Sequence, residues 1–322
     1  MTDAILITGA AGFIGHHFVQ HVLDHTKYDV VALDRFDEFA VVNSFENERI
    51  ITYDWDLEYA LGGLLNKERG VVRYVVSLAA ESHVDRSIIN PVGFLLNNSL
   101  SAAHVLDYSR RCLPQARVLH MSTDEVYGAA APGQCFHEGD RFRPTNPYAA
   151  SKAAAEALCP AYANTYKMDI CVVRSTNVYG PHQHCEKFIP MAIGQIQRGE
   201  TVQIHSRDGV AATRMYLHVS DLCRALMLVL ENGDSIKRGE DRAGYYNVSG
   251  ALEYSNLAVA LKLAELLGLP LHYELVEDPP NRPRPDMRYS ISCDRMRELG
   301  WTARVELEPG LRSVVNAAEV AA

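Results

Sequence analysis

The stretch NPYAASKAAAE places Tyr148 and Lys152 four residues apart at the start of a sequence that favours a helix. Because residues four apart project from the same face of an α-helix, the two side chains are predicted to lie side by side. A desolvated lysine ammonium group favours the phenolate and so lowers the pKa of the tyrosine. The pair could therefore remove the proton of an alcohol while a hydride leaves the same carbon. With 16 tyrosines in the chain, this spacing could also arise by accident.

Two adjacent carboxylates, Asp124 and Glu125, follow the apolar stretch ARVLHMS, which is typical of a buried strand. Neighbouring like charges repel each other, so a fold gains no stability from such a pair in a half-buried position. A solvated loop is the usual place for an isolated Asp-Glu pair. Thr123, which precedes the pair, could hydrogen-bond the same alcohol as Tyr148, or its hydroxyl could be satisfied by the backbone.

The elements that must position these side chains alternate regularly. Short apolar strands are predicted at AILIT, DVVALD, RIITYD, VRYVVSLAA and ARVLHMS, with segments of helical length between them. This alternation predicts an α/β fold with a Rossmann-type doubly wound parallel sheet and helices on both faces. After residue 176 the apolar periodicity weakens and prolines appear. We expect a dinucleotide-binding domain at 1–176 that also carries the catalytic residues. A smaller C-terminal α/β substrate-binding domain is expected at 177–322, with some segments returning to the first domain.

The first strand runs directly into GAAGFIG, in which Gly9, Gly12 and Gly15 recur every third residue. Strand, glycines, helix, second strand and terminal acid in this order indicate a dinucleotide-binding unit. The helix N-terminus offers free N–H groups to a pyrophosphate. Asp34, at the end of the second strand, can accept hydrogen bonds from the adenine-ribose hydroxyls and repel a 2′-phosphate. NAD is therefore predicted rather than NADP, although the neighbouring Arg35 leaves NADP open.

The composition is that of a globular protein of 322 residues, 48% hydrophobic and 22% charged. A net charge of −9 argues against nucleic acid as a partner, because phosphate binding requires a basic face. Seven scattered cysteines without a C-x-x-C pair suit reduced thiols, and the spacing of histidines indicates no metal site. Asp3 precedes a short apolar run, and no apolar run could cross a bilayer. We therefore expect a cytoplasmic protein with no signal peptide and no membrane partner.

Taken together, seven stretches resemble the extended short-chain dehydrogenase/reductases, and within them the NAD-dependent nucleotide-sugar 4,6-dehydratases of the dTDP-glucose type. These stretches are TGAAGFIG, AAESHVDRS, STDEVYG, PTNPYAASK, NVYGP, EKFIP and NRPRPDMRY. The resemblance covers nearly the whole chain, and TDEVYG marks the dehydratases. The sister 4-epimerases and decarboxylases usually lack the Asp-Glu pair at this point.

The resemblance implies a reaction in three stages on a nucleotide-diphospho-glucose. Tyr148 deprotonates the carbon-4 hydroxyl while NAD⁺ accepts the hydride, water is eliminated across carbons 5 and 6, and the hydride returns to carbon 6. By resemblance Glu125 is the base at carbon 5 and Asp124 the acid at carbon 6, so the two carboxyl groups must differ in protonation state. The catalytic residues would then be Thr123, Asp124, Glu125, Tyr148 and Lys152.

The glycine-rich loop and the resemblance also suggest binding residues. Those expected to contact NAD are Gly9, Gly12, Phe13, Ile14, Gly15, Asp34, Asp56, Leu57, Ala79, Asn98, Tyr148, Lys152 and Ser175. Those expected to contact the nucleotide sugar are Ser82, Asn177, Lys187, His205, Arg214, Asn247, Arg282 and Arg288. Asn247 and Arg288 are the weaker candidates, and Asp56 and Leu57 could equally belong to a solvated turn.

The nucleotide base, the partner and the exact reaction each leave alternatives. By resemblance dTDP-glucose is expected first. QIHSRDGVAATR, however, looks two residues longer than in relatives, with His205 where thymidine-type enzymes often carry tyrosine, which leaves UDP-glucose as the next alternative. Relatives dimerise through a four-helix bundle, and the helices expected near 91–112 and 147–166 carry apolar residues on more than one face. A homodimer is therefore expected, with deeper burial in one chain as the alternative. A 4-epimerase or decarboxylase, or a non-catalytic NAD-binding sensor or scaffold, are the alternative functions.

Overall fold

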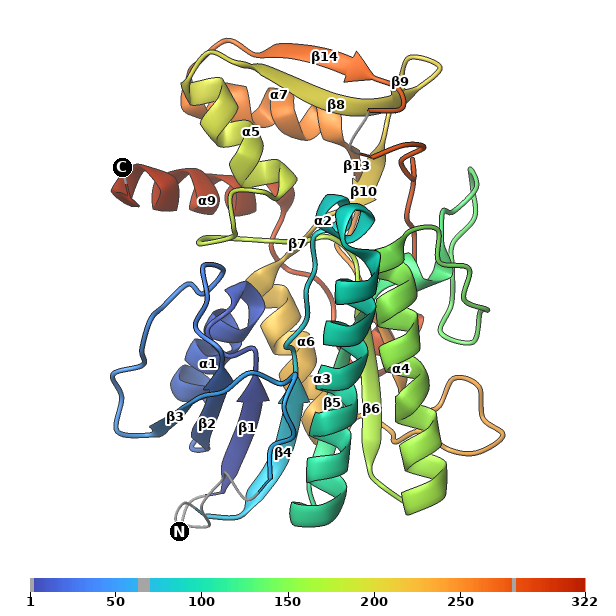
Figure 1. Cartoon of the computed structure of the whole chain (residues 1–322). Helices are drawn as coiled ribbons and strands as arrows, with labels where there is room; N and C mark the ends of the chain where they lie inside the picture. The colour runs from blue at the N-terminus through green and yellow to red at the C-terminus, as the bar shows by residue number, and fades with distance from the viewer. Residues whose placement is uncertain (1–2, 63–69, 280–281, 322) are drawn as a thin grey trace.

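Seven parallel strands form the central sheet in the order β12-β6-β5-β4-β1-β2-β3 (Figure 1). The computed structural model describes residues 3–62, 70–279 and 282–321. The sheet contains β1 (Ala4–Thr8), β2 (Asp29–Asp34), β3 (Ile50–Asp54), β4 (Val72–Ser77), β5 (Arg117–Thr123), β6 (Ile170–Ser175) and β12 (Tyr245–Val248). The five strands expected from the sequence are β1 to β5, and the predicted fold class is confirmed. The strand order reverses between β1 and β4, where open parallel sheets bind ligands at their carboxyl edge.

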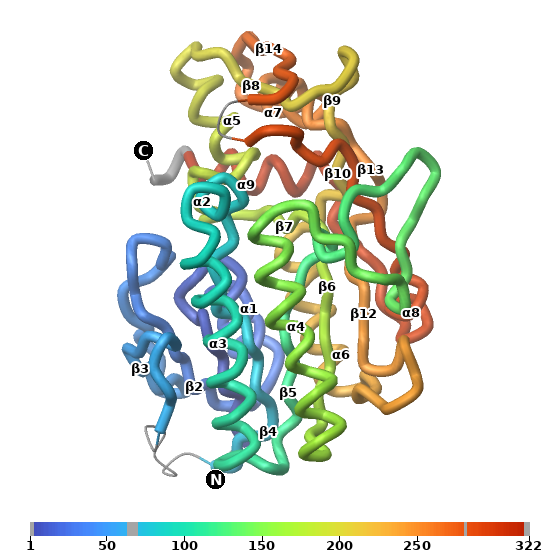
Figure 2. The backbone as a smooth tube through the Cα atoms, turned by 45° about the vertical axis from the view of Figure 1, so that its right-hand side comes forward, coloured from blue at the N-terminus to red at the C-terminus, as the bar shows by residue number. Residues whose placement is uncertain are grey.

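Helices cover both faces of this sheet. Figure 2 shows α3 and α4 side by side on one face, and α1 and α6 pack together on the other. Their bounds are α1 (Phe13–His25), α3 (Pro91–Cys112), α4 (Pro147–Tyr166) and α6 (Val219–Asn232). In β1, Ile5 and Ile7 join the core beneath α1 and α6, whereas Ala4 and Leu6 join the core beneath α3 and α4. Alternate residues of a strand point to opposite faces, so a strand covered on both faces must be apolar throughout.

A smaller layer lies above the carboxyl ends of the strands (Figure 1). In this layer β8 pairs with β14 in parallel and with β9 antiparallel. Helices α5, α7 and α9 share with β8 a separate core that includes Ile193, Ile204, Leu263 and Leu311. The bounds are β8 (Thr201–Arg207), β9 (Val210–Ala211), β14 (His272–Val276), α5 (Phe188–Gln197), α7 (Asn256–Leu267) and α9 (Leu307–Ala321).

The remaining elements are short, and the chain passes between the two layers more than once. They are α2 (Val84–Ile89), the 3₁₀ turn η1 (Asp124–Tyr127), β7 (Val178–Tyr179), β10 (Thr213–Met215), β11 (Leu217–His218), β13 (Glu253–Ser255) and α8 (Asp294–Glu298). Two elements beyond residue 176, α6 and β12, lie against the central sheet, while the division into domains at that residue stays a prediction. Within the described ranges, no helix is both long and apolar enough to cross a membrane.

Candidate active site

A cavity of about 570 Å³ lies where the carboxyl ends of β1, β2, β4, β5 and β6 face the smaller layer. The glycine-rich loop and Asp34 line one part of this cavity. The Asp-Glu pair, Tyr148 and Lys152 line its middle, and side chains of α5 and β8 line the part under the smaller layer. The cavity therefore joins the expected cofactor site, the expected catalytic residues and the expected substrate site in one continuous space.

The loop between β1 and α1 requires glycine at two positions. Gly9 has a φ of 68°, and a Cβ there would lie 2.7 Å from the backbone nitrogen of Ala79. A Cβ on Gly15 would lie 1.9 Å from the carbonyl oxygen of Gly9, so α1 can approach β1 only with glycine at this position. Gly12 is the N-cap of α1 and offers no side-chain cap. The first N–H groups of α1 are therefore available to an anionic group such as a pyrophosphate.

The carboxylate of Asp34 is held at the end of β2 by two backbone groups. Its Oδ2 accepts a hydrogen bond from the Ala11 N–H at 2.8 Å, and its Oδ1 accepts one from the Phe36 N–H at 3.1 Å. The guanidinium of Arg35 is occupied, since it donates to Asp37 at 2.5 Å and to Glu81 at 2.7 Å. Arg35 is thus already neutralised by two carboxylates. This end of the cavity fits NAD better than NADP. The 2′-phosphate of NADP would be repelled by the Asp34 carboxylate, and the neighbouring Arg35 is already paired and cannot neutralise it.

Tyr148 and Lys152 lie in the first turns of α4, and both side chains are buried. The N-cap Asn146 fixes the start of this helix, because its side chain accepts a hydrogen bond from the Ala149 N–H at 2.8 Å. The Lys152 ammonium donates to the Met121 carbonyl oxygen of β5 at 2.7 Å. Burial lowers the pKa of Lys152 to about 8, because an apolar environment disfavours its charged form.

The expectation that Lys152 lowers the pKa of Tyr148 is wrong for the protein groups alone. Burial raises the pKa of the Tyr148 phenol, and the neighbouring Glu125 raises it further, while a hydrogen bond with Thr123 acts in the opposite direction. The Lys152 ammonium is directed to a backbone carbonyl instead. The protein by itself therefore keeps the phenol protonated, and a cation bound next to it would favour the phenolate.

The Asp-Glu pair does not lie in a solvated loop. β5 ends at Thr123, and a single 3₁₀ turn then carries Asp124 into the cavity, where its side chain is 3% exposed. Burial, and next the charge of Glu125, raise the pKa of Asp124 to about 8, so this carboxyl group is protonated at neutral pH. Among the described residues, its Oδ2 has no hydrogen-bond partner. Glu125 differs, since its Oε2 accepts a hydrogen bond from the Asn146 amide at 2.9 Å.

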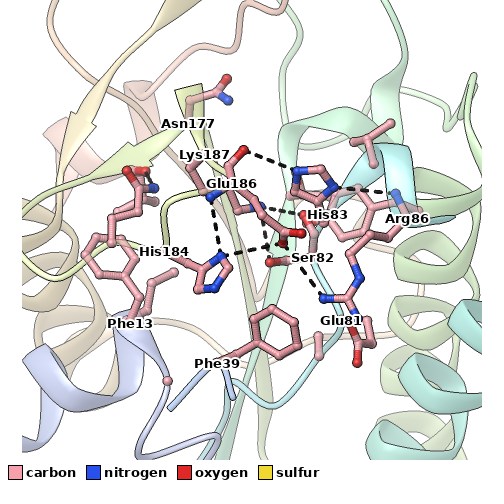
Figure 3. Close-up of a pocket in the computed structure, with 18 of the residues that line it drawn as sticks. Phe13, Phe39, Glu81, Ser82, His83, Arg86, Asn177, His184, Glu186 and Lys187 are labelled. Atoms are coloured by element: carbon pink, nitrogen blue, oxygen red, sulfur yellow. Dashed lines mark hydrogen bonds and ion pairs between the residues drawn. The ribbon is translucent and has the colours of Figure 1, made fainter. Parts of the chain in front are cut away.

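Opposite walls of the cavity meet through polar side chains of α2, α5 and the loops before them (Figure 3). The Lys187 ammonium donates to the Ser82 carbonyl oxygen at 2.7 Å. The His83 ring contacts the Glu186 carbonyl oxygen at 3.2 Å, and the Arg86 guanidinium lies 3.8 Å from the Glu186 carboxylate. These contacts join the two walls of the cavity. Burial lowers the pKa of Lys187 to about 8.

Most of the residues expected from the sequence line this cavity. They are Gly9, Gly12, Phe13, Ile14, Gly15, Asp34, Asp56, Leu57, Ala79, Ser82, Thr123, Asp124, Glu125, Tyr148, Lys152, Ser175, Asn177, Lys187, His205, Arg214 and Arg282. His205 is partly buried beside Arg282, and burial, with Arg282 as a lesser cause, lowers its pKa to about 4. Its ring is therefore neutral at pH 7.

Three expected residues do not line the cavity. Asn98 lies beneath it, because its side chain accepts from the Glu81 N–H at 2.8 Å and donates to the Ser151 hydroxyl at 2.8 Å. The fully buried Asn247 accepts a hydrogen bond from the Tyr127 hydroxyl at 2.9 Å. Arg288 is paired with Glu253 at 2.9 Å and donates to backbone carbonyls of 131 and 134. Their polar groups are used within the fold, and the assignment of these three residues to ligand contacts stays a prediction.

Two further residues of the site were not expected from the sequence. Tyr289 lines the cavity with its hydroxyl 3.2 Å from the Oε2 of Glu125, and the Asn146 amide donates to the same oxygen. Both belong to stretches that carry the resemblance, since Tyr289 ends NRPRPDMRY and Asn146 lies in PTNPYAASK. Their place in these stretches was the one sign in the sequence that they belong to the site. Their contacts with Glu125 could not be predicted, because these contacts depend on the fold.

Comparisons with known proteins agree with this geometry. The model of the "NAD dependent epimerase/dehydratase family" matches residues 5–249. The chain is 36% identical to the low-salt glycan biosynthesis protein Agl12 of Haloferax volcanii, over 97% of each chain. It is similar to the dTDP-glucose 4,6-dehydratase DesIV of Streptomyces venezuelae, solved with NAD bound, with 33% identity and a TM-score of 0.86 over 98% of this chain and 97% of that one. A Thermus thermophilus UDP-glucose 4-epimerase, also with NAD, matches with 26% identity and a TM-score of 0.87, over 99% of this chain and all of that one.

The match of the family model extends over most of the chain and includes both the glycine-rich loop and the residues expected to be catalytic. The cofactor of this family is NAD, and the cavity has the loop, the helix N-terminus and the acid that NAD requires. The chain therefore belongs to the NAD-dependent epimerase/dehydratase family and is an NAD-dependent enzyme.

Proposed function

We propose that this enzyme is a nucleotide-diphospho-glucose 4,6-dehydratase that forms the 4-keto-6-deoxy sugar. The observation that carries the proposal is the buried, protonated Asp124 beside Glu125 in the cavity that also contains Tyr148. Elimination of water across carbons 5 and 6 needs a base and an acid at adjacent carbons. Epimerisation at carbon 4 needs no base at carbon 5 and no acid at carbon 6. The similarity to DesIV supports the same assignment.

The first stage is proton removal from the carbon-4 hydroxyl. Bound NAD supplies the acceptor for the carbon-4 hydride and later returns that hydride to carbon 6. Tyr148 takes the hydroxyl proton, and Thr123, whose hydroxyl lies between Asp124 and the phenol, holds the same oxygen in place. The Lys152 ammonium group is held behind the site by its hydrogen bond to the Met121 carbonyl oxygen. These roles place the ketone at carbon 4, which acidifies the proton on carbon 5.

The second stage is the elimination, for which the two carboxyl groups act on neighbouring carbons. Glu125 removes the carbon-5 proton as a carboxylate, and Asp124 gives its proton to the carbon-6 hydroxyl, which leaves as water. After the hydride has been returned to carbon 6, Glu125 gives a proton to carbon 5. The Tyr148 phenol passes the proton that it took from the carbon-4 hydroxyl to Asp124, which restores both groups. The net change is the loss of one water, made of the carbon-4 hydroxyl proton and the carbon-6 hydroxyl. Low exposure of Asp124 keeps its proton in place until the hydroxyl departs.

The nucleotide end of the substrate faces the smaller layer. Arg214, Arg282 and Lys187 are cationic residues that line the cavity, and we assign the diphosphate to them. Gln203 and His205 alternate with core residues on β8 and line the same region, so we assign the base to their side of the cavity. The dTDP sugar is the first expectation and the UDP sugar the second.

The test is incubation of the purified protein with dTDP-glucose, UDP-glucose and a guanine nucleotide sugar. We expect a product that has lost one water and shows the alkaline absorbance of a 4-keto-6-deoxy sugar, fastest with dTDP-glucose. A hexose epimer of unchanged mass would instead support the 4-epimerase function, which the similarity to the Thermus thermophilus epimerase keeps as the second candidate.

We also propose that the protein is a homodimer. The α3 residues Val92, Leu95, Leu96 and Leu100 are 64%, 45%, 53% and 38% exposed and share one side of the helix. An exposed apolar row of this kind marks a protein interface. Light scattering should give twice the chain mass, and Leu96→Glu should give the monomer. The control Leu252→Glu, at a residue 60% exposed on another part of the chain, should remain dimeric. A stable wild-type monomer at micromolar concentration would contradict the proposal.

A further inference from the structure

The Glu125 carboxylate also contacts a second tyrosine of the cavity wall, Tyr289. The Tyr289 hydroxyl lies 3.2 Å from the Glu125 Oε2 and 2.5 Å from the Oδ2 of Asp286. Tyr289 itself is 2% exposed, whereas Asp286 is partly exposed and also accepts a hydrogen bond from the Thr145 hydroxyl. Four oxygen-bearing groups thus form a continuous path from the base in the cavity to the protein surface.

The number of protons on Tyr289 limits which hydrogen bonds this path can contain at one time. The phenol of Tyr289 has one proton, so it can donate to only one of the two carboxylates at a time. The shorter contact is to Asp286, and the Oε2 of an ionised Glu125 still accepts from Asn146. Once Glu125 has accepted a proton, its new O–H can donate to the Tyr289 oxygen across the 3.2 Å contact. Tyr289 can therefore keep its hydrogen bond to Asp286 whether Glu125 is ionised or protonated, and it can accept a hydrogen bond from Glu125 in the protonated state.

The surroundings of Tyr289 favour a coupled transfer over a free phenolate. Burial raises the pKa of Tyr289 well above its usual value, with Glu125 as the next cause, while Arg214 acts in the opposite direction from its position 4.6 Å above the ring. The phenol therefore gives up its own proton only as it receives another. No net charge then accumulates on the buried ring.

We infer that Tyr289 and Asp286 form a proton relay that connects Glu125 to solvent, an inference that rests on the proposed dehydratase function. The carbon-5 C–H bond breaks and an O–H bond forms on Glu125. That proton passes to the Tyr289 oxygen as the Tyr289 proton passes to the Asp286 carboxylate, which releases it to water. The return of a proton to carbon 5 follows the same steps in reverse, so the cycle consumes no proton. Tyr289 and Asp286 are positioning residues, because they act through Glu125.

The experiment is turnover of unlabelled dTDP-glucose in heavy water, with the isotope at carbon 5 of the product measured by mass spectrometry. The wild-type product should carry deuterium at carbon 5. Tyr289→Phe and Asp286→Asn should return the original proton, with exchange slowed by about 10²-fold, the lower range for a positioned proton-transfer group. Asp294→Asn is the matched control, because Asp294 is a surface carboxylate paired with Arg297 outside the cavity. The product of Asp294→Asn should carry as much deuterium at carbon 5 as the product of the wild type.

The isotope readout separates a relay from a merely structural role. If Tyr289 only held Glu125 in place, its variant would lower kcat with full deuterium at carbon 5, and that result overturns the relay. Asp286→Asn keeps the phenol and so tests the relay even if Tyr289→Phe folds poorly. Full deuteration with Asp286→Asn also overturns it. Failure of the wild type to dehydrate any sugar overturns the proposed function and the relay together, before any variant is compared.

Discussion

Glu125→Gln should stop the reaction after oxidation at carbon 4. An amide cannot remove the carbon-5 proton, whereas Tyr148, Thr123 and Lys152 remain in place for the first stage. We therefore expect the reduced cofactor and a 4-keto-hexose to accumulate on the enzyme, with overall turnover reduced by about 10²–10⁴-fold, the usual contribution of a positioned acid or base. Reduced-nicotinamide absorbance in a single turnover measures this directly.

Tyr148→Phe is the matched control for this result. It removes the base of the first stage, so the cofactor should stay oxidised and no absorbance should appear. Gln has nearly the size of Glu and can still accept from Asn146, so the contacts around the side chain change little. Wild-type turnover by Glu125→Gln would contradict the dehydratase mechanism and would return the Asp-Glu pair to a structural role.

Asp124 should set the alkaline limit of the elimination. Its pKa is raised to about 8, so the group is a proton donor below that pH and loses its proton as the pH rises through it. The rate of water loss should be level from pH 6 to 7 and fall above about pH 8. Asp124→Asn should lower this rate by about 10²–10⁴-fold and remove the alkaline limb, because an amide cannot protonate the leaving hydroxyl.

Lys152 also titrates in this pH range, so its effect must be separated from that of Asp124. The separation is possible because the two residues act in different stages of the reaction. Burial lowers the pKa of Lys152 to about 8 as well, so its charge is lost in the same range. Lys152 acts at the oxidation, which Glu125→Gln isolates. The oxidation measured with Glu125→Gln should show the alkaline limb of Lys152 alone, whereas a limb of the elimination that disappears in Asp124→Asn belongs to Asp124. An elimination rate that is independent of pH up to 10 would contradict the role of Asp124.

The sequence predicted well those features that depend on neighbours in the chain. The strands β1 to β5 follow from short apolar runs, and the need for glycine at Gly9 and Gly15 follows from the turn between strand and helix. Tyr148 and Lys152 are neighbours because one helical turn places them together. These features need only local periodicity and backbone geometry.

The features that the sequence missed depend on contacts between distant segments. Tyr289 meets Glu125 although 164 residues separate them. The buried amide of Asn247 is used by Tyr127, 120 residues away, so an apparently free polar residue belongs to the core. The pKa of Tyr148 was expected to fall because the sequence shows the lysine but not the depth of burial. Such effects require the packed structure.

The return of α6 and β12 to the central sheet has a consequence for how the chain can be divided. A fragment that ends at residue 176 would lack β12, which would leave β6 as an open edge, and would lack α6, which covers the apolar side of α1. Open edges and uncovered apolar faces promote aggregation. Segments from beyond residue 200 therefore complete the sheet that the first 176 residues begin. A fragment that ends at residue 176 should accordingly aggregate, whereas the full chain should not.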